Sequence, residues 1–165
     1  MRLILASSSP RRKELLNMLG FVPEIIVPFV DESSLPGEPM EVFLRRVSIA
    51  KGEAVYREEF FDVPVVSSDT IVWCDNLIIG KPVDRDEAYR FMKILSGNVH
   101  EVLTGVAVRY RGISYYEYAR TRVEFSQISE EELAYYLDKE HYLDKAGAYA
   151  IQGLASAFIK RIEGC

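Results

Sequence analysis

The sequence predicts a mixed α/β fold, in which a sheet of parallel and antiparallel strands is flanked by helices. Short apolar runs of strand length are interspersed with segments of helical periodicity, but they do not follow strict strand–helix–strand alternation. Two long strand-like segments, 99–110 and 113–125, are separated only by Arg111-Gly112, which predicts an antiparallel hairpin. The chain has 165 residues, of which 48% are hydrophobic. We therefore expect residues 1–165 to form a single domain with one sizeable core.

The first elements are predicted to be a strand, a helix and a second strand. The continuous apolar run Leu3–Ala6 favours a buried strand. Ser9 suits the N-cap of a helix and Pro10 its first position, and Gly20 suits its end. The segment 21–30 is predicted to be the second strand. The helix should present an apolar face made of Leu15, Leu16, Met18 and Leu19.

The middle of the chain is predicted to hold a loop, a long helix and a strand pair. Residues 31–39 are rich in Pro, Gly, Ser and acidic side chains, which is typical of a loop. A helix should run from Pro39 to about Glu58. The apolar segment 65–74 is predicted to be a strand, and Asp75-Asn76 to form a turn before a short strand over 77–80.

The last elements are introduced by two capping-box patterns, Asp84 with Glu87 and Ser129 with Glu132. The first predicts a helix that ends at Ser96-Gly97, and the second a short helix that ends near Lys139. Residues 140–153 show little periodicity and are predicted to be a loop. The segment 154–162 is predicted to be a final strand.

Composition excludes several functional classes. The formal net charge of −5 argues against a general nucleic-acid binder, which would be basic. Cys74 and Cys165 form neither a disulfide framework nor a zinc motif, and Cys74 should be a small core residue. His100 and His141, the only two histidines, give weak support to a zinc site or a Ser-His-Asp triad. No apolar run reaches membrane-spanning length, so a cytoplasmic protein is expected.

A possible anion site opens the chain. Arg11, Arg12 and Lys13 occupy the first turn of the predicted helix, where the helix dipole disfavours cations. A bound anion would remove this conflict, because backbone N–H groups, serine hydroxyls and guanidinium groups would converge on it. A solvated basic turn explains the same residues equally well.

Two charged residues are unusual for their positions. Lys51 shares a helical face with Phe43, Val47 and Ala54, so it either extends outward to solvent or reaches into a site. Asp69 ends the run Val65–Ser68, and a carboxylate at the end of a core strand is costly unless it is paired, hydrogen-bonded or metal-bound. An Asp that caps a turn is the alternative for Asp69.

Weaker signals lie in three loops. Gly80-Lys81-Pro82 places a lysine just after a strand, and Asp31-Glu32 offers carboxylates. Asp144–Gly153 is rich in small residues that permit close approach of a ligand, and the Gln152 amide could recognise a nucleobase edge. A tight surface loop is an equal alternative for this last segment. Neither a P-loop nor a Rossmann glycine pattern is present.

Together these segments resemble the Maf family of nucleoside triphosphate pyrophosphatases, and the resemblance covers nearly the whole chain. The ordered set is specific although each piece is weak. It consists of Ser7–Arg12, Asp31-Glu32, Ala50-Lys51, Ser68–Thr70, Gly80–Pro82, Ser96-Gly97 with His100, Thr104-Gly105, and Asp144–Gly153.

The resemblance implies an inosine-triphosphatase-like fold with an elongated mixed central sheet, two lobes and a cleft. It implies hydrolysis between the α- and β-phosphates of dTTP and UTP, which would limit incorporation of unwanted or modified nucleotides. Family members usually continue past Gly164, so the domain is expected to be short at its C-terminus.

The resemblance also implies a divalent metal, and the negative charge of a triphosphate predicts residue roles. Asp69, Lys51 and Lys81 would be catalytic, and Glu32 and Asp69 would hold the metal, Mg²⁺ or Mn²⁺, which suits carboxylate and phosphate oxygens. The substrate would be bound by Ser7, Arg11, Arg12, Thr70 and Gln152.

Two other functions remain open alternatives. One is a broader pyrophosphatase that acts on inosine or xanthosine triphosphate, and the other is a nucleotide-binding regulatory protein without turnover. The expected partner is a nucleoside triphosphate rather than a nucleic acid or a membrane. Whether the chain forms a homodimer is left open.

Overall fold

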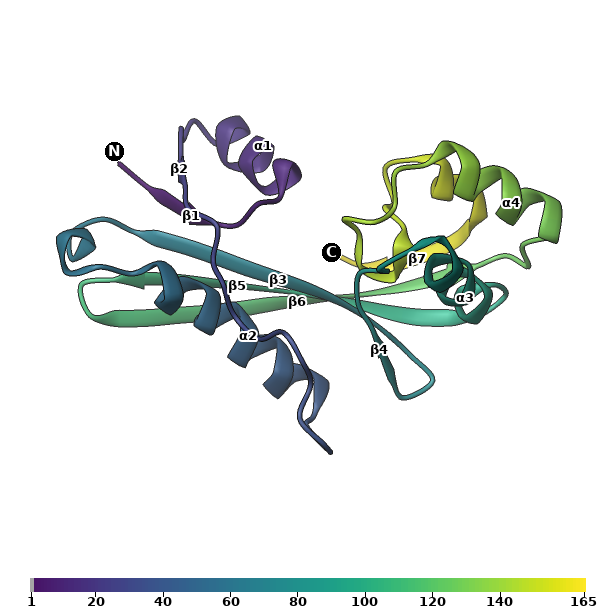
Figure 1. Ribbon diagram of the computed structural model, residues 1–165, viewed down its shortest axis with the longest axis horizontal. Coiled ribbons are helices and arrows are strands. Elements are labelled where there is room, and N and C mark those ends of the chain that lie inside the picture. The colour runs from purple at the N-terminus through teal and green to yellow at the C-terminus, as the bar shows by residue number, and fades with distance from the viewer. Residues whose placement is uncertain (1) are drawn as a thin grey trace. The chain divides into compact units, whose positions relative to one another are not determined.

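The computed structural model describes residues 2–165, which contain a seven-stranded mixed sheet (Figure 1). The strands are β1 (Ile4–Ala6), β2 (Glu24–Ile25), β3 (Val65–Cys74), β4 (Leu77–Ile79), β5 (Val99–Tyr110), β6 (Ile113–Phe125) and β7 (Ile159–Gly164). Their order is β2-β1-β3-β5-β6-β7, with β4 paired to β3. The β1 strand is parallel to β2 and β3, whereas β4 is antiparallel to β3 and β7 is antiparallel to β6.

Helices flank this sheet, which confirms the predicted mixed fold class. The α-helices are α1 (Pro10–Met18), α2 (Met40–Val55), α3 (Arg85–Leu95) and α4 (Glu130–Lys139). Three short 3-10 helices accompany them: η1 (Glu58–Phe60), η2 (Ala146–Ala148) and η3 (Leu154–Phe158).

The chain divides into two compact units. The first comprises the residues up to Asp69 together with Thr104–Tyr118, and the second comprises Thr70–Leu103 together with Ala119–Cys165. The strands β3, β5 and β6 contribute to both. One buried cluster of the first unit consists of Ile4, Ala6, Val55, Phe60 and Val65. The larger cluster of the second unit includes Met92, Leu95, Val123, Phe125, Leu133, Tyr136 and Tyr149.

In the first unit, α1 and α2 lie on opposite sides of β3 (Figure 1). Ser9 occupies the N-cap position of α1 as predicted, but its side chain makes no capping bond. Gly20 follows the end of the helix with a φ of +85°, which favours glycine. The predicted apolar face is not buried: Leu15 is 59% and Met18 is 82% exposed.

Two predicted boundaries in the first unit are wrong. Of the segment 21–30, only Glu24–Ile25 joins the sheet, because Pro23 and Pro28 cannot donate to a strand ladder. The helix predicted to reach Glu58 ends at Val55. There the Arg57 guanidinium donates to the carbonyls of Ala54, Val55 and Tyr56, which satisfies the last turn.

The two predicted turns are confirmed. Asp75 and Asn76 have φ values of +49° and +63°, the left-handed pair that a two-residue hairpin needs. Arg111 and Gly112 repeat this arrangement with φ values of +48° and +79°. Because each turn fixes the register of its strands, the bounds of β3, β5 and β6 agree with the prediction.

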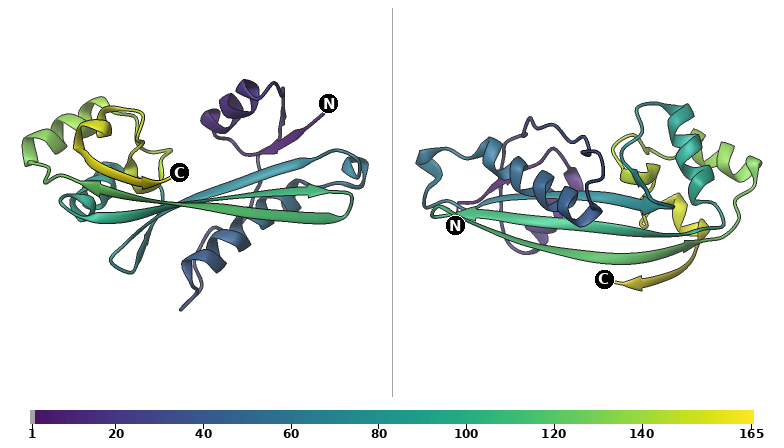
Figure 2. Two further views of the ribbon diagram at one scale, coloured as in Figure 1. Left: turned by 180° about the vertical axis from the view of Figure 1, so that it is seen from behind. Right: turned by 90° about the horizontal axis from the view of Figure 1, so that it is seen from below.

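In the second unit, α3 and α4 pack against each other (Figure 2). The Asp84 carboxylate accepts a bond from the Glu87 N–H at 2.8 Å, and Ser129 and Glu132 form the predicted capping box. Across the helix pair, Glu130 of α4 accepts from Tyr89 at 2.8 Å and from Lys93 at 2.6 Å. These contacts confirm both predicted helix starts.

The predicted final strand is partly wrong. Residues 154–158 form the 3-10 helix η3, and the strand begins only at Ile159. Ala155 and Phe158 are the buried residues of this turn. A 3-10 helix places residues three apart above one another, so this spacing buries both on one side.

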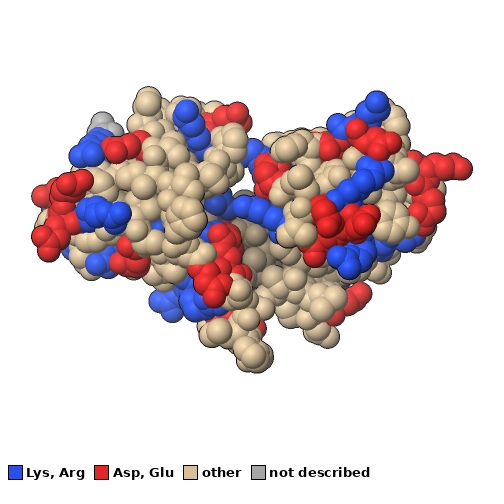
Figure 3. Space-filling view, in the orientation of Figure 1, with Lys and Arg blue, Asp and Glu red and all other residues tan. Residues whose placement is uncertain are grey.

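Charged side chains of both signs are interspersed on the face shown in Figure 3. This distribution agrees with the negative net charge and provides no broad basic surface there. Cys74 is 1% exposed, which confirms its prediction as a core residue. Among residues 2–165, no helix has the length and apolarity needed to cross a membrane.

Candidate active site

A buried lysine between two carboxylates forms the centre of the candidate site. The Lys51 Nζ lies 2.7 Å from Asp69 Oδ1 and 2.8 Å from Glu32 Oε2. Lys51 is 5% exposed and Asp69 is 7% exposed, whereas the Glu32 side chain is 49% exposed. The lysine therefore reaches inward instead of extending to solvent, and Asp69 lies within β3 instead of capping a turn.

Close packing of α2 against β3 brings Lys51 to Asp69. Ser67 and Asp69 lie two residues apart on β3 and so point to the same side of the sheet. The Ser67 hydroxyl donates to the Ser48 carbonyl at 2.7 Å. A Cβ atom at Gly52 would lie 2.9 Å from Ser67 Oγ, so glycine permits this approach without a shift of the Ser67 side chain. Sequence reasoning missed Gly52 and Ser67, although a glycine inside a helix is a recognisable signal of close packing.

The first turn of α1 adds a guanidinium group to this unit, and the loop before the helix adds a serine hydroxyl. Arg12 Nη1 donates to the Ser68 carbonyl at 2.6 Å and to Ser7 Oγ at 3.2 Å. The Ser9 N–H also donates to Ser7 Oγ, at 3.1 Å. Burial lowers the pKa of Arg12, while the charges of Asp69 and Glu32 raise it. The structure thus places Arg12 and Ser7 beside Asp69, whereas Arg11 is exposed.

The two carboxylates of the Asp31-Glu32 loop have different roles. Asp31 Oδ1 accepts from the Ser33 N–H at 2.8 Å and from the Ser33 hydroxyl, and these bonds lower the pKa of Asp31. This local turn fixes the loop. Glu32, the next residue, extends to Lys51. Of these two neighbouring residues, only Glu32 therefore contributes a carboxylate to the candidate site.

The carboxylates of Glu32 and Asp69 fit a divalent cation that is shared with a bound substrate. Among residues 2–165, no group of three or more His, Cys, Asp or Glu side chains could enclose a metal ion. Mg²⁺, however, is often held by one or two carboxylates together with substrate phosphates. Glu32 and Asp69 converge on the same Lys51 nitrogen, so their arrangement suits a metal that is shared with a bound substrate.

Three predicted site residues belong to the second unit. Lys81 and Gln152 are exposed there, and Thr70 is partly buried. The Gly147 N–H donates to the Gly80 carbonyl at 2.9 Å, which joins the Lys81 loop to the loop 140–153. The convergence of these three residues with Lys51 and Asp69 stays a prediction.

Gly147 is required where these loops meet. Its φ is +69°, and a Cβ atom there would lie 2.9 Å from the Val72 side chain and 3.3 Å from the Tyr149 ring. The segment Asp144–Gly153 is thus a structured loop whose small residues permit close packing within the protein.

His100 of β5 and Tyr149 of this loop form a buried pair. His100 Nε2 lies 2.6 Å from the Tyr149 hydroxyl, and burial lowers the pKa of His100 from 6.5 to about 4. Burial also raises the pKa of Tyr149. His141, in contrast, has a side chain that is 79% exposed, as predicted. His100 therefore supports the core of this unit as a neutral imidazole.

The His100 pair predicts a pH-dependent stability. The unfolded chain takes up a proton near pH 6.5, whereas the folded protein does so only near pH 4. Stability is therefore fully present above pH 6.5 and falls by about 3 kcal/mol as the pH drops through this window. In His100→Gln, which keeps a hydrogen-bonding partner for Tyr149, the thermal midpoint should fall less between about pH 7 and pH 5 than in the unchanged protein. Equal falls in both proteins would contradict this.

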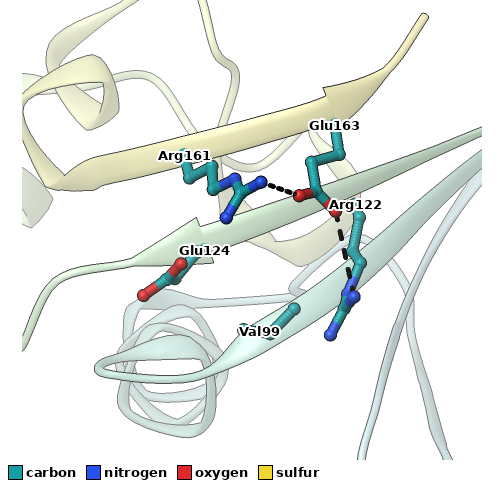
Figure 4. Close-up of a pocket in the computed structure, with 5 residues that line it drawn as sticks. All are labelled: Val99, Arg122, Glu124, Arg161 and Glu163. Atoms are coloured by element: carbon teal, nitrogen blue, oxygen red, sulfur yellow. Dashed lines mark ion pairs between the residues drawn. The ribbon is translucent and has the colours of Figure 1, made fainter.

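A shallow pocket lies elsewhere in the second unit. It is lined by Val99, Arg122, Glu124, Arg161 and Glu163, which project from β5, β6 and β7 (Figure 4). Both arginines pair with Glu163, and Glu124 pairs with Lys160 at 2.7 Å. The pocket contains none of the predicted site residues, and its balanced charges make it a poor anion site.

Comparison with known proteins identifies the family of this chain. The family model described as "Maf-like protein" matches residues 2–165. A dTTP/UTP pyrophosphatase of Dechloromonas aromatica is 42% identical, over 99% of this chain and 88% of the relative. The dTTP/UTP pyrophosphatase of Vibrio cholerae is 41% identical, over 99% of this chain and 87% of the relative.

The fold has a counterpart among solved structures. The Ham1 protein of Staphylococcus aureus superposes with a TM-score of 0.53 at 12% identity, over 96% of this chain and 91% of that protein. This likeness confirms the predicted inosine-triphosphatase-like fold and, at such low identity, concerns the fold alone.

Proposed function

This chain belongs to the Maf-like protein family, and we propose on that premise that it hydrolyses dTTP and UTP to the nucleoside monophosphate and pyrophosphate. Relatives that are about two-fifths identical over nearly the whole chain are named dTTP/UTP pyrophosphatases. The observation that carries the proposal is the buried Lys51, which is shared by Asp69 and Glu32 and lies in the same unit as Arg12. This group combines carboxylates and cations in one place, as hydrolysis of a polyanion requires.

The residues of the first unit have distinct roles in this proposal. Arg12 and the Ser7 hydroxyl bind a phosphate group, since guanidinium groups suit planar, bidentate recognition of phosphate. Lys51 orients the Asp69 carboxylate and neutralises developing charge. Asp69 accepts the proton of the attacking water, which a positioned carboxylate can do.

A divalent cation, Mg²⁺ or Mn²⁺, is part of the proposal. Glu32 and Asp69 would hold it together with the substrate phosphates. When bound, such an ion lowers the pKa of a coordinated water and stabilises charge on the leaving pyrophosphate. The metal requirement rests on the donor chemistry of these two carboxylates.

The second unit supplies the remaining predicted roles. Lys81 contributes a further cation for the phosphates, and the Gln152 amide recognises the nucleobase. Thr70 contributes to the choice of substrate, together with Arg11 of the first unit. The protein is proposed to act in the cytoplasm, and sedimentation would distinguish a homodimer from a monomer.

A nucleotide panel tests the proposed function. The protein is incubated with dTTP, UTP, dCTP, inosine triphosphate and xanthosine triphosphate with Mg²⁺ or Mn²⁺, and released pyrophosphate is measured. Preferential turnover of dTTP and UTP is expected. Preferential turnover of inosine or xanthosine triphosphate would instead establish the broader pyrophosphatase. Binding without release of pyrophosphate would establish a regulatory protein.

Removal of divalent cations should abolish turnover. With EDTA in excess, the release of pyrophosphate from dTTP is expected to fall to background, because Glu32 and Asp69 hold no metal to activate water. Addition of Mg²⁺ or Mn²⁺ beyond the chelator should restore the rate. Full turnover in EDTA after exhaustive dialysis would contradict the metal proposal while leaving the substrate proposal standing.

A further inference from the structure

The Glu140 carboxylate closes the base of the loop that carries Gln152. Glu140 follows α4, and its Oε2 accepts from the Leu154 N–H at 3.0 Å, so it joins the two ends of the loop 140–154. Its Oε1 accepts from the His141 N–H at 3.1 Å and lies 3.7 Å from the Lys145 Nζ. The side chain of Glu140 is 18% exposed and that of Lys145 is 9% exposed. This carboxylate is therefore a partly buried anchor instead of a solvated surface charge.

The same loop is also held at residues 147–149, which precede Gln152 in the chain. Gly147 donates its N–H to the Gly80 carbonyl at 2.9 Å, and the Tyr136 hydroxyl donates to the Ala148 carbonyl at 2.8 Å. Tyr149 is buried against His100. Between Tyr149 and the Leu154 N–H held by Glu140, only residues 150–153 remain. We call residues 150–153 the Gln152 arc.

The Gln152 arc passes directly over the anchor. A Cβ atom on Gly153 would lie 2.8 Å from Glu140 Oε2, so the backbone approaches the carboxylate closely. Gln152, one residue earlier, is exposed. The position of its amide is thus set by Tyr149 on one side and by Glu140 on the other.

We propose that Glu140 is a positioning residue that sets the choice of nucleobase by holding the Gln152 arc. This inference rests on the proposed function and on Gln152 as the reader of the base. A side chain that recognises a base edge must be held in place, because an unrestrained loop loses conformational freedom on each binding event. A partly buried carboxylate that accepts two backbone N–H bonds and contacts a lysine supplies that restraint.

The anchor acts on recognition and not on the bond-breaking step. None of its contacts involves Asp69, Lys51 or Arg12, which belong to the other unit. Loss of the anchor should therefore weaken discrimination between bases and raise KM, while kcat at saturating dTTP changes little.

The test compares binding of two bases in Glu140→Gln and Glu140→Asp. The amide of the first variant cannot accept at both positions, and the carboxylate of the second is too short to reach Leu154. The probes are the α,β-methylene analogues of dTTP and dCTP, which present opposite donor and acceptor patterns and resist hydrolysis. In both variants the ratio of the two dissociation constants should fall about tenfold towards unity.

Asp138→Asn is the matched control. Asp138 lies on α4, the helix that Glu140 follows, and it pairs with Arg85 at 2.7 Å through a side chain that is 61% exposed. The binding ratio should be unchanged in this variant. Adding Glu140→Gln to Gln152→Ala should produce no further loss of discrimination, because the anchor acts through Gln152.

Hydrogen exchange gives a readout that is independent of binding. The amides of residues 150–154 should exchange faster in both Glu140 variants, while those of α3 keep their protection. An unchanged binding ratio with faster exchange would overturn the inference, and so would an additive loss in the Gln152→Ala background. Turnover of dTTP by the unchanged protein tests the proposed function separately. If the unchanged protein bound neither analogue, both the proposed function and the role of Glu140 would be overturned.

Discussion

Replacing Asp69 with asparagine should lower kcat for dTTP by about 10³-fold, since Asn cannot accept the proton of the attacking water. The substitution keeps an oxygen that can still accept from Lys51, now 2.7 Å from Asp69 Oδ1. The fold should therefore be retained. Initial rates of pyrophosphate release over a range of dTTP concentrations measure the effect, and circular dichroism checks the fold.

The control for this variant is Asp62→Asn. Asp62 belongs to the same unit and pairs with Arg111 at 2.7 Å, but its side chain is 67% exposed. Its removal should leave kcat unchanged. Near-normal turnover in Asp69→Asn, with the fold intact, would eliminate Asp69 as the proton acceptor.

Replacing Lys51 with methionine should damage both activity and stability. The change removes the ammonium group that pairs with Asp69 at 2.7 Å, and it leaves that 7% exposed carboxylate close to Glu32. An uncompensated buried charge typically costs about 3 kcal/mol or more, so the free energy of unfolding should fall by that order. Turnover of dTTP should fall by about 10²-fold or more, because a preorganised charge is lost. Urea unfolding and initial rates measure the two effects.

Lys160→Met provides the comparison for Lys51. Lys160 pairs with Glu124 at a similar distance of 2.7 Å, but its side chain is 64% exposed. Solvent screens such a pair, so the urea midpoint should be unchanged. If Lys51→Met proved as stable as Lys160→Met, the Lys51 pair would contribute no more than a surface contact.

Local signals predicted the elements whose ends are fixed by local chemistry. The hairpin turns at Asp75-Asn76 and Arg111-Gly112 and the two capping boxes gave correct bounds, because their bonds join neighbours in sequence. The prediction of a strand over residues 21–30 was wrong because it gave the apolar content of the segment more weight than its two prolines. The helix α1 was predicted correctly but its apolar face is exposed, since periodicity does not reveal whether another surface covers that face.

The candidate site was predicted in its residue types but not in its geometry. Lys51 and Asp69 each stood out as charges in apolar surroundings, yet their contact spans 18 positions of the chain and needs the packing of a helix on a strand. Glu32 was predicted as a metal ligand, but its contact with Lys51 was not predicted. The anchor at Glu140 was not predicted, since both of its hydrogen bonds are accepted from backbone N–H groups, which no residue type marks in a sequence.

The contact between Gly52 and Ser67 limits which substitutions can accumulate together at these two positions. With 2.9 Å between a Cβ at position 52 and the serine oxygen, a larger residue on the helix requires a smaller one on the strand. Positions 52 and 67 should therefore covary, with their combined side-chain volume held near that of one serine. A homologue that enlarges both would have to move its helix outward and draw the lysine at 51 away from the aspartate at 69.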